Sequence, residues 1–280
     1  MTVRIVTDSA CDLPDSVAAD LGIEIVPLSI RFGDTEFIDR VELTTAEFWA
    51  KCAATPTLPE TSAPPPGAFE AAYRRAASDG ATGVVVVSLS SALSATMQSA
   101  EVAARSIADG ITVRFVDSRS VSLGLGTIAV ACARRAAEGA DVDEVAALGI
   151  DLASRTRVFG ALDTLDNLKK GGRIGNAKAL LATALAIKPI IEVIDGKVEQ
   201  GGKQRTRTKA LAFLVDKVRE YQGRMSGLAV LHADCTDVDQ FVAMLRPLYE
   251  GEIIVGEIGP VIGSHAGRGT IGVAFTESTG

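Results

Sequence analysis

The sequence predicts a two-domain α/β protein, with an N-terminal domain over residues 1–160 and a smaller C-terminal α/β domain over residues 161–280. Four consecutive valines, Val84–Val87, indicate a strand buried on both faces, because short β-branched runs suit a parallel sheet. Strand and helix patterns alternate through the first half, which favours right-handed crossovers and a mostly parallel sheet with flanking helices. Basic and glycine-rich loops become frequent after Arg157–Asp163, so we place the domain boundary there.

The first quarter of the chain predicts a strand, a helix, a half-buried strand and a second helix. Pro14 lies at the start of the first helix, where its missing N–H group is tolerated. Apolar and polar residues alternate along the second strand, as expected where one face is buried. Thr44 and Glu47 have the spacing of a capping box, in which a hydroxyl and a carboxylate satisfy exposed amides at a helix start. In order, these elements span Met1–Asp8, Pro14–Leu21, Val26–Phe32 and Ala46–Ala54.

Five prolines lie between Thr55 and Gly67 and predict an extended backbone without helix or ladder pairing. Thr61 and Ser62 lie inside this segment. Their backbone has little freedom to reorient, which suits contact with a ligand at fixed geometry. A surface linker with incidental hydroxyls fits the composition equally well.

The loop Ser88–Ser94 connects the valine strand to a helix whose apolar spacing begins near Ala95. Ligands in open α/β sheets bind at the carboxyl ends of strands, and the N–H groups of a helix start favour an anion. We therefore expect Ser94 to contact the anionic head of a small ligand. The alternative is that its hydroxyl only caps the helix.

Further elements follow from the same periodicities. In the first half they are the helix Ala68–Ser78, the strand Thr112–Asp117, a helix ending at Glu138 and a helix begun by the capping box of Asp141 and Glu144. In the second half they are the basic glycine loop Lys169–Gly175, the helix Ala177–Ala186, the strand Ile187–Ile194, the basic cluster Lys203–Lys209, the strand Leu228–His232, the helix Val238–Leu248, and the strands Ile253–Ile258 and Ile271–Phe275. Asp195-Gly196 predicts a hairpin, because a type I′ turn needs positive φ at both central positions.

The charge and the cysteines exclude several classes of protein. With 28 basic and 35 acidic residues the net charge is −7, which disfavours general nucleic-acid binding. The N-terminal pattern is not that of a signal peptide, and no apolar run approaches a membrane span, so we expect no stable membrane insertion. The cysteines lie far apart without a C-x-x-C pair, which suggests a reducing cytoplasm and neither a zinc site nor a disulfide framework. They are Cys11, Cys52, Cys132 and Cys235.

Seven short motifs occur in register along the chain. They are Thr7-Asp8-Ser9, Thr61-Ser62, Leu93-Ser94-x-Thr96 with Gln98-Ser99-Ala100, Lys170–Ile174, Ile187–Ile190, Arg205-Thr206-Arg207 with Lys209-Ala210, and Gly269–Gly272. Each is weak alone, but together they are specific. Over about residues 3–278 the chain resembles the DegV family of bacterial fatty-acid-binding proteins.

The resemblance implies a protein that encloses a long-chain fatty acid such as palmitate between its two domains, with the carboxylate held by hydroxyls matching Thr61 and Ser94. Ser62 and His265 are further candidates near the carboxylate. The resemblance also implies a non-catalytic carrier in lipid transport or fatty acid metabolism, which presents its ligand to a separate ATP-dependent fatty acid kinase. Apart from the bound fatty acid, we expect no cofactor and no metal. Candidates for docking the kinase are Arg173, Arg205 and Arg207.

Three positions depart from the usual family pattern. Ala95 stands where glycine commonly follows the serine, and Ala63-Pro64-Pro65 replaces a more usual Gln-Pro-Ser. Both changes lie next to the expected head-group site. Arg268 stands where proline is frequent, on the expected docking face.

The chemistry agrees with a lipid ligand. Two neutral hydroxyls and a helix N-terminus leave a bound carboxylate open to further reaction, whereas an arginine fork would neutralise and bury it. At roughly 0.8 kcal/mol per buried methylene, a chain of palmitate length contributes on the order of 10 kcal/mol before ordering costs. The tail would therefore supply most of the affinity.

Two other functions are compatible with parts of the sequence. A serine-dependent acyl hydrolase could use Ser94 and His265 with Asp8 or Asp117, but the G-x-S-x-G elbow is missing around Ser94. A nucleotide-binding or kinase subunit could use Gly171-Gly172, but no G-x-x-x-x-G-K-[ST] motif is present.

Overall fold

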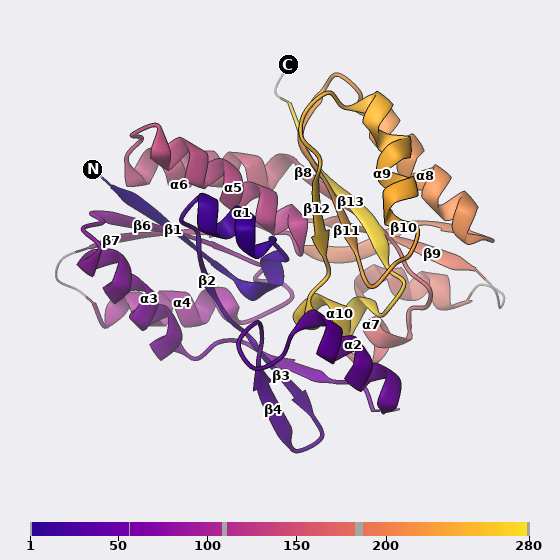
Figure 1. Ribbon diagram of the computed structural model, residues 1–280, viewed down its shortest axis with the longest axis horizontal. Coiled ribbons are helices and arrows are strands. Elements are labelled where there is room, and N and C mark those ends of the chain that lie inside the picture. The colour runs from indigo at the N-terminus through magenta and orange to yellow at the C-terminus, as the bar shows by residue number, and fades with distance from the viewer. Residues whose placement is uncertain (1, 56, 108–110, 183–186, 279–280) are drawn as a thin grey trace.

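Three sheets organise the computed structural model, which describes residues 2–55, 57–107, 111–182 and 187–278 (Figure 1). One is a four-stranded sheet built from the first half of the chain, and another is a six-stranded sheet built from the second half. The third is a small three-stranded sheet. Figure 1 shows the two larger sheets on opposite sides of the molecule, with helices α5 (Leu123–Ala137) and α6 (Val142–Arg155) between them.

The four-stranded sheet is parallel throughout, in the order β2-β1-β6-β7, as the sequence predicted. Every residue of β6 is buried. Because alternate residues of a strand face opposite sides, Val84 and Val86 pack into one core with α3 and α4, and Val85 and Val87 pack into another with α5 and α6. The elements of this region are β1 (Val3–Asp8), the 3-10 helix η1 (Ser9–Cys11), α1 (Asp15–Asp20), β2 (Glu24–Val26), α3 (Pro66–Ser78), β6 (Gly83–Ser88), α4 (Thr96–Arg105) and β7 (Thr112–Asp117).

The six-stranded sheet is antiparallel except for one parallel pair, β11 with β12, and its order is β10-β9-β8-β13-β11-β12. Helices α8 and α9 cover one face, and α5 packs on the other face, where Ala229 and Leu231 join the core that also contains Val85. The predicted domain boundary between residues 160 and 161 falls within the strand of this sheet that comes first in the sequence. Its elements are β8 (Thr156–Ala161), β9 (Lys188–Ile194), β10 (Lys197–Gln204), α8 (Arg207–Glu220), β11 (Met225–His232), α9 (Val238–Leu245), the 3-10 helix η3 (Arg246–Leu248), β12 (Ile254–Glu257) and β13 (Ile271–Glu277).

The small sheet corrects two predictions. The alternating segment Val26–Phe32 is not one strand, because β2 ends at Val26 and β3 (Ser29–Phe32) belongs to a different sheet. Pro27 separates the two strands and has no N–H group to continue a ladder. The proline-rich segment does pair, since β5 (Glu60–Ser62) runs antiparallel to β3. The third strand of this sheet is β4 (Thr35–Ile38).

Local signals in the remaining loops are mostly confirmed. The capping box of Thr44 and Glu47 begins α2 (Thr45–Ala54), and that of Asp141 and Glu144 begins α6. Both residues of the Asp195-Gly196 turn have positive φ, 50° and 76°, between β9 and β10. No helix in the described part of the chain is long and apolar enough to cross a membrane.

Three short helices differ from the prediction or were missed. The segment expected as the helix Ala177–Ala186 overlaps the 3-10 helix η2 (Gly175–Ala182), and its last four residues, 183–186, lie outside the described residues. The helix α7 (Asp166–Lys170) extends into the start of the basic glycine loop expected over Lys169–Gly175, and the helix α10 (Pro260–Ala266) was not predicted. Gly263 of α10 lies against α2, where a Cβ would come within 2.9 Å of Phe48 and Trp49 side-chain atoms.

Candidate functional site

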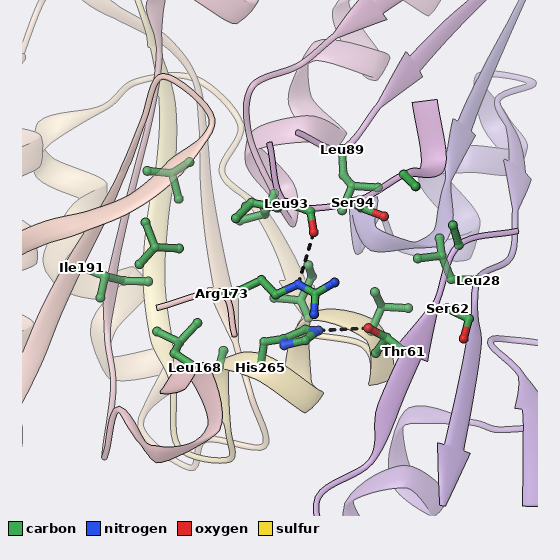
Figure 2. A pocket seen from close by; sticks show the side chains of 18 residues that line it. Leu28, Thr61, Ser62, Leu89, Leu93, Ser94, Leu168, Arg173, Ile191 and His265 are labelled. Atoms are coloured by element: carbon green, nitrogen blue, oxygen red, sulfur yellow. Dashed lines mark hydrogen bonds between the residues drawn. The ribbon is translucent and has the colours of Figure 1, made fainter. Parts of the chain in front are cut away.

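A cavity of about 200 Å³ lies where the two large sheets and the small sheet meet. Most of its wall is aliphatic, and the polar side chains of the wall belong to threonine, serine, arginine and histidine residues (Figure 2). The lining residues are Leu28, Thr61, Ser62, Ala63, Leu89, Leu93, Ser94, Ala95, Val121, Leu168, Arg173, Ile191, Val193, Val198, Val261, Ile262, His265 and Ala266.

The loop after β6 forms one wall, at the carboxyl end of the parallel strands, as expected. Asp8, at the end of neighbouring β1, fixes the start of this loop by accepting hydrogen bonds from the Leu89 amide at 2.8 Å and the Ser88 hydroxyl at 3.1 Å. Burial raises the pKa of Asp8 to about 6, although these hydrogen bonds oppose the shift. These hydrogen bonds join the ends of β1 and β6 next to the cavity wall.

Ser94 lies in this wall and is half-buried. Its Oγ is 2.9 Å from the Thr96 hydroxyl and accepts a 3.3 Å hydrogen bond from the Thr96 amide. Because a hydroxyl oxygen has two lone pairs and one proton, these local bonds leave Ser94 some capacity to meet a ligand. Ser94 precedes Ala95, the N-cap of α4, which has no side-chain cap hydrogen bond, so Ser94 is not the N-cap residue, and its contact with a ligand stays a prediction.

Thr61 enters the cavity from β5, and its Oγ1 is 2.9 Å from Nε2 of His265. The two residues are 204 positions apart in the sequence, so only the fold brings them together. Ser62 is exposed, and Figure 2 shows its hydroxyl pointing away from His265. The alternation along β5 explains this difference between adjacent hydroxyls.

His265 lies near the end of α10 and is neutral at pH 7. Burial, and next the nearby charge of Arg173, lower its pKa to about 4. Its Nδ1 is buried and makes no hydrogen bond within the described residues. Gly171 lies against the ring, and a Cβ at this position would come within 2.4 Å of Nδ1. The glycine loop therefore sets the position of the imidazole.

Arg173 supplies the positive charge of the cavity. The sequence suggested a docking role for it, but the structure places it in the cavity wall beside His265 (Figure 2). Its Nε donates to the Leu93 carbonyl at 3.2 Å and its Nη1 to the Gly171 carbonyl at 2.7 Å. Across the described ranges it forms no ion pair with a carboxylate. A guanidinium held by carbonyls in this way keeps a full charge and free N–H groups for an anion.

The other two docking candidates lie outside the cavity. Arg207 binds both carboxylate oxygens of Asp237, at 2.9 and 2.8 Å, and also donates to the Gly269 carbonyl. Arg205 is exposed just before α8. Of the two, Arg205 is the more accessible.

The groups of the hydrolase alternative are not hydrogen-bonded as a triad. Ser94 bonds to Thr96 and His265 to Thr61, and no bond joins Ser94 to His265 in the described chain. Asp8 accepts hydrogen bonds from Ser88 and Leu89. Asp117 accepts hydrogen bonds from Ser91 and Arg119, so neither carboxylate orients His265. Among the described residues there is also no group of three or more His, Cys, Asp or Glu side chains that could hold a metal.

The β9–β10 hairpin closes the cavity from the side of the second sheet. Ser90 donates a 2.7 Å hydrogen bond to the carbonyl of Gly196, and Arg119 pairs with Asp195. Val193 and Val198, which flank the turn, line the cavity. The hairpin thus joins the second sheet to the loops that follow β6 and β7.

This geometry is that of an α/β protein with an apolar cavity whose wall carries an arginine, a histidine and hydroxyl groups. The chain belongs to the DegV family, because it matches that family, described as uncharacterised proteins, over residues 2–278. A DegV domain-containing protein of Mycobacterium tuberculosis is 39% identical over 279 residues, covering 98% of this chain and 96% of that protein.

Two solved structures support the same assignment. A DegV family protein from Thermus thermophilus, described by its fatty acid binding, is 33% identical with a TM-score of 0.90, covering 99% of this chain and 100% of that one. DegV of Bacillus subtilis, described as a fatty acid binding protein, is 27% identical with a TM-score of 0.89 over 99% of this chain and 100% of that one. The predicted family and mixed α/β fold are confirmed.

Proposed function

We propose that this chain binds a long-chain fatty acid, such as palmitate, in the cavity between its two large sheets. One observation carries the proposal: a guanidinium without a carboxylate partner in the described chain, Arg173, lies among hydroxyls in an otherwise aliphatic wall. A fatty acid matches this wall, because its carboxylate complements the charge and its tail complements the aliphatic side chains. The fatty acid binding of the Thermus thermophilus relative supports the same ligand class.

In this proposal the carboxylate accepts hydrogen bonds from Arg173 and from the hydroxyl of Thr61 or Ser94. This differs from the sequence-based expectation that neutral hydroxyls and a helix N-terminus alone hold it, because Arg173 lines the cavity. The neutral imidazole of His265 holds the Thr61 hydroxyl at 2.9 Å and adds no second positive charge. The acyl chain lies against residues of the second sheet, Ile191, Val193 and Val198. Ser62 contributes little, because its hydroxyl points elsewhere.

Native mass spectrometry of the purified protein tests this directly. We expect a bound fatty acid, and after delipidation we expect palmitate to bind about 10- to 100-fold more tightly than hexadecanol, because the alcohol forfeits a charge-assisted hydrogen bond worth about 1.5–3 kcal/mol. Equal affinity for acid and alcohol would show that the head group is not recognised. A protein that carries no fatty acid and binds none contradicts the proposal altogether.

We also propose that the protein is a cytoplasmic, non-catalytic carrier that presents the carboxylate to a separate ATP-dependent fatty acid kinase, with Arg205 on the docking face. Arg205 is exposed and next to the start of α8, whereas Arg207 is engaged by Asp237. The Arg205→Ala variant should bind palmitate normally but slow acyl-phosphate formation by an added kinase. Arg105→Ala, at the exposed end of α4, is the control. Equal rates for both variants count against docking at Arg205.

A further inference from the structure

The guanidinium of Arg173 and the imidazole of His265 lie beside each other in the cavity wall, although they come from different segments of the chain (Figure 2). Arg173 follows helix α7 in the glycine loop, whereas His265 belongs to helix α10. Among the residues that line the cavity, Arg173 alone carries a charge at pH 7. The head-group site therefore depends on how α7 is placed against α10.

Asn167 is the residue of α7 that reaches α10. Its Nδ2 donates a 3.3 Å hydrogen bond to the carbonyl of Ser264, the residue before His265. Its side chain also packs next to the end of α10, since a Cβ at Gly267 would lie 3.5 Å from the Asn167 amide nitrogen. Among the described residues no other hydrogen bond joins α7 to α10.

The position of Ser264 explains why an amide side chain suits this place. Ser264 is one of the last four residues of α10, whose carbonyl groups have no partner within the helix. The residue is buried, so its carbonyl oxygen needs a donor from another segment. The Asn167 amide supplies that donor, and this hydrogen bond favours one placement of the two helices.

The backbone of Asn167 holds the glycine loop at the same time. Its carbonyl accepts a 2.8 Å hydrogen bond from the Gly171 amide. The Gly171 carbonyl in turn accepts a 2.7 Å hydrogen bond from Nη1 of Arg173, and a Cβ at Gly171 would collide with the imidazole of His265. Asn167 is thus connected to His265 through Ser264, and to Arg173 through Gly171.

We propose that Asn167 is a positioning residue for the head-group site, which keeps the guanidinium of Arg173 beside the imidazole of His265. This role rests on the proposed function, in which Arg173 bonds the carboxylate and His265 holds the Thr61 hydroxyl. Asn167 does not line the cavity, so it acts only through these two residues. A substitution can remove its side-chain bond to Ser264, and the test addresses that bond.

The titration of His265 in the full-length protein is the first measurement. Asn167→Leu removes the N–H donor and retains a side chain of similar size. The chain has two histidines, so ¹H–¹³C NMR of the imidazole Cε1–H groups resolves both, with His232 of β11 as the internal control. Burial, and next the charge of Arg173, lower the pKa of His265 to about 4. Both effects weaken if α7 and α10 separate, so the pKa of His265 should rise toward 6.5 in the variant while that of His232 stays unchanged.

Isothermal titration with palmitate and with hexadecanol is the second measurement. For Asn167→Leu we expect the preference for the acid over the alcohol to fall about threefold, as for a lost neutral hydrogen bond, with unchanged affinity for hexadecanol. Asn176→Leu is the matched control. It removes a side-chain hydrogen bond to Glu199, 2.9 Å long and outside the cavity, and should change neither measurement.

An unchanged pKa of His265 in folded Asn167→Leu, or an unchanged preference for the acid over the alcohol, overturns the positioning role. If Asn167→Leu does not fold, Asn167→Ala removes the same donor and is judged by the same two measurements. The histidine titration needs no ligand. A parent protein that binds no fatty acid therefore refutes the proposed function, while the titration still decides whether Asn167 positions the two groups.

Discussion

Two charged side chains, Arg173 and Asp39, are surrounded differently. An aliphatic wall holds Arg173, which has carbonyl acceptors but no carboxylate partner in the described chain. Asp39 is buried at 1% exposure, and the nearby Arg40 opposes the rise that burial causes in its pKa. Arg173 therefore faces a cavity, whereas the protein closes around Asp39. The difference teaches that a charge indicates the chemistry of a ligand only where it faces a cavity.

The largest expected effect is on the affinity for palmitate and follows from the charge of Arg173. Replacing Arg173 with Gln should weaken palmitate binding about 10- to 100-fold, because a charge-assisted hydrogen bond contributes about 1.5–3 kcal/mol. Hexadecanol binding should change much less, since the alcohol gains little from the charge. Isothermal titration measures both, with Arg105→Gln as the charge-matched control. If the loss is equal for acid and alcohol, Arg173 shapes the cavity and does not recognise the carboxylate.

The second prediction concerns how Asp39 and His265 make the free energy of unfolding depend on pH. Burial raises the pKa of Asp39 from its ordinary 3.8 to about 6, so its contribution to the free energy of unfolding falls as pH rises through that interval. Burial lowers the pKa of His265 from 6.5 to about 4, so its contribution rises with pH over nearly the same interval. Each contribution is on the order of 2 kcal/mol across the window.

Urea denaturation at several pH values between 4 and 7 separates these opposing contributions. Relative to the parent protein, stability should increase more steeply with pH in Asp39→Asn and less steeply in His265→Gln. The double variant should return close to the parent slope. Parallel stability curves for all four proteins would mean that neither group changes its proton affinity on folding.

The smallest expected effects distinguish the hydroxyls of the first cavity. Thr61→Val should weaken palmitate binding by about 2- to 10-fold, as for a neutral hydrogen bond of about 0.5–1.5 kcal/mol. Ser94→Ala should cost no more, because its oxygen already bonds to Thr96. Ser62→Ala should have no measurable effect. Competition with a fluorescent fatty acid ranks the three variants, and a dominant effect of Ser62→Ala would require a different head-group position.

Local signals predicted the scaffold well. The valine run, the capping boxes and the Asp195-Gly196 turn each depend on neighbours in the sequence, and their elements lie where expected. The errors arise where pairing with distant residues decides the outcome. β5 forms between prolines because β3 supplies its partner strand, and Val26–Phe32 divides because its two ends join different sheets.

The candidate site was only partly predictable for the same reason. Thr61, Ser94 and His265 were selected from the sequence, and all three line one cavity. The position of Arg173 was not predicted, because a lysine- and glycine-rich loop looks like a solvent-exposed surface until α7 and α10 fold it inward.

The seven-residue helix α10 is about 10 Å long, which is too short to bend. Gly263 seats it tightly against the rings of Phe48 and Trp49, so it moves as a rigid rod or not at all. A displacement of the rod at Pro260 would therefore also displace His265 at the opposite end, and with it the Thr61 hydroxyl that lies 2.9 Å from the imidazole.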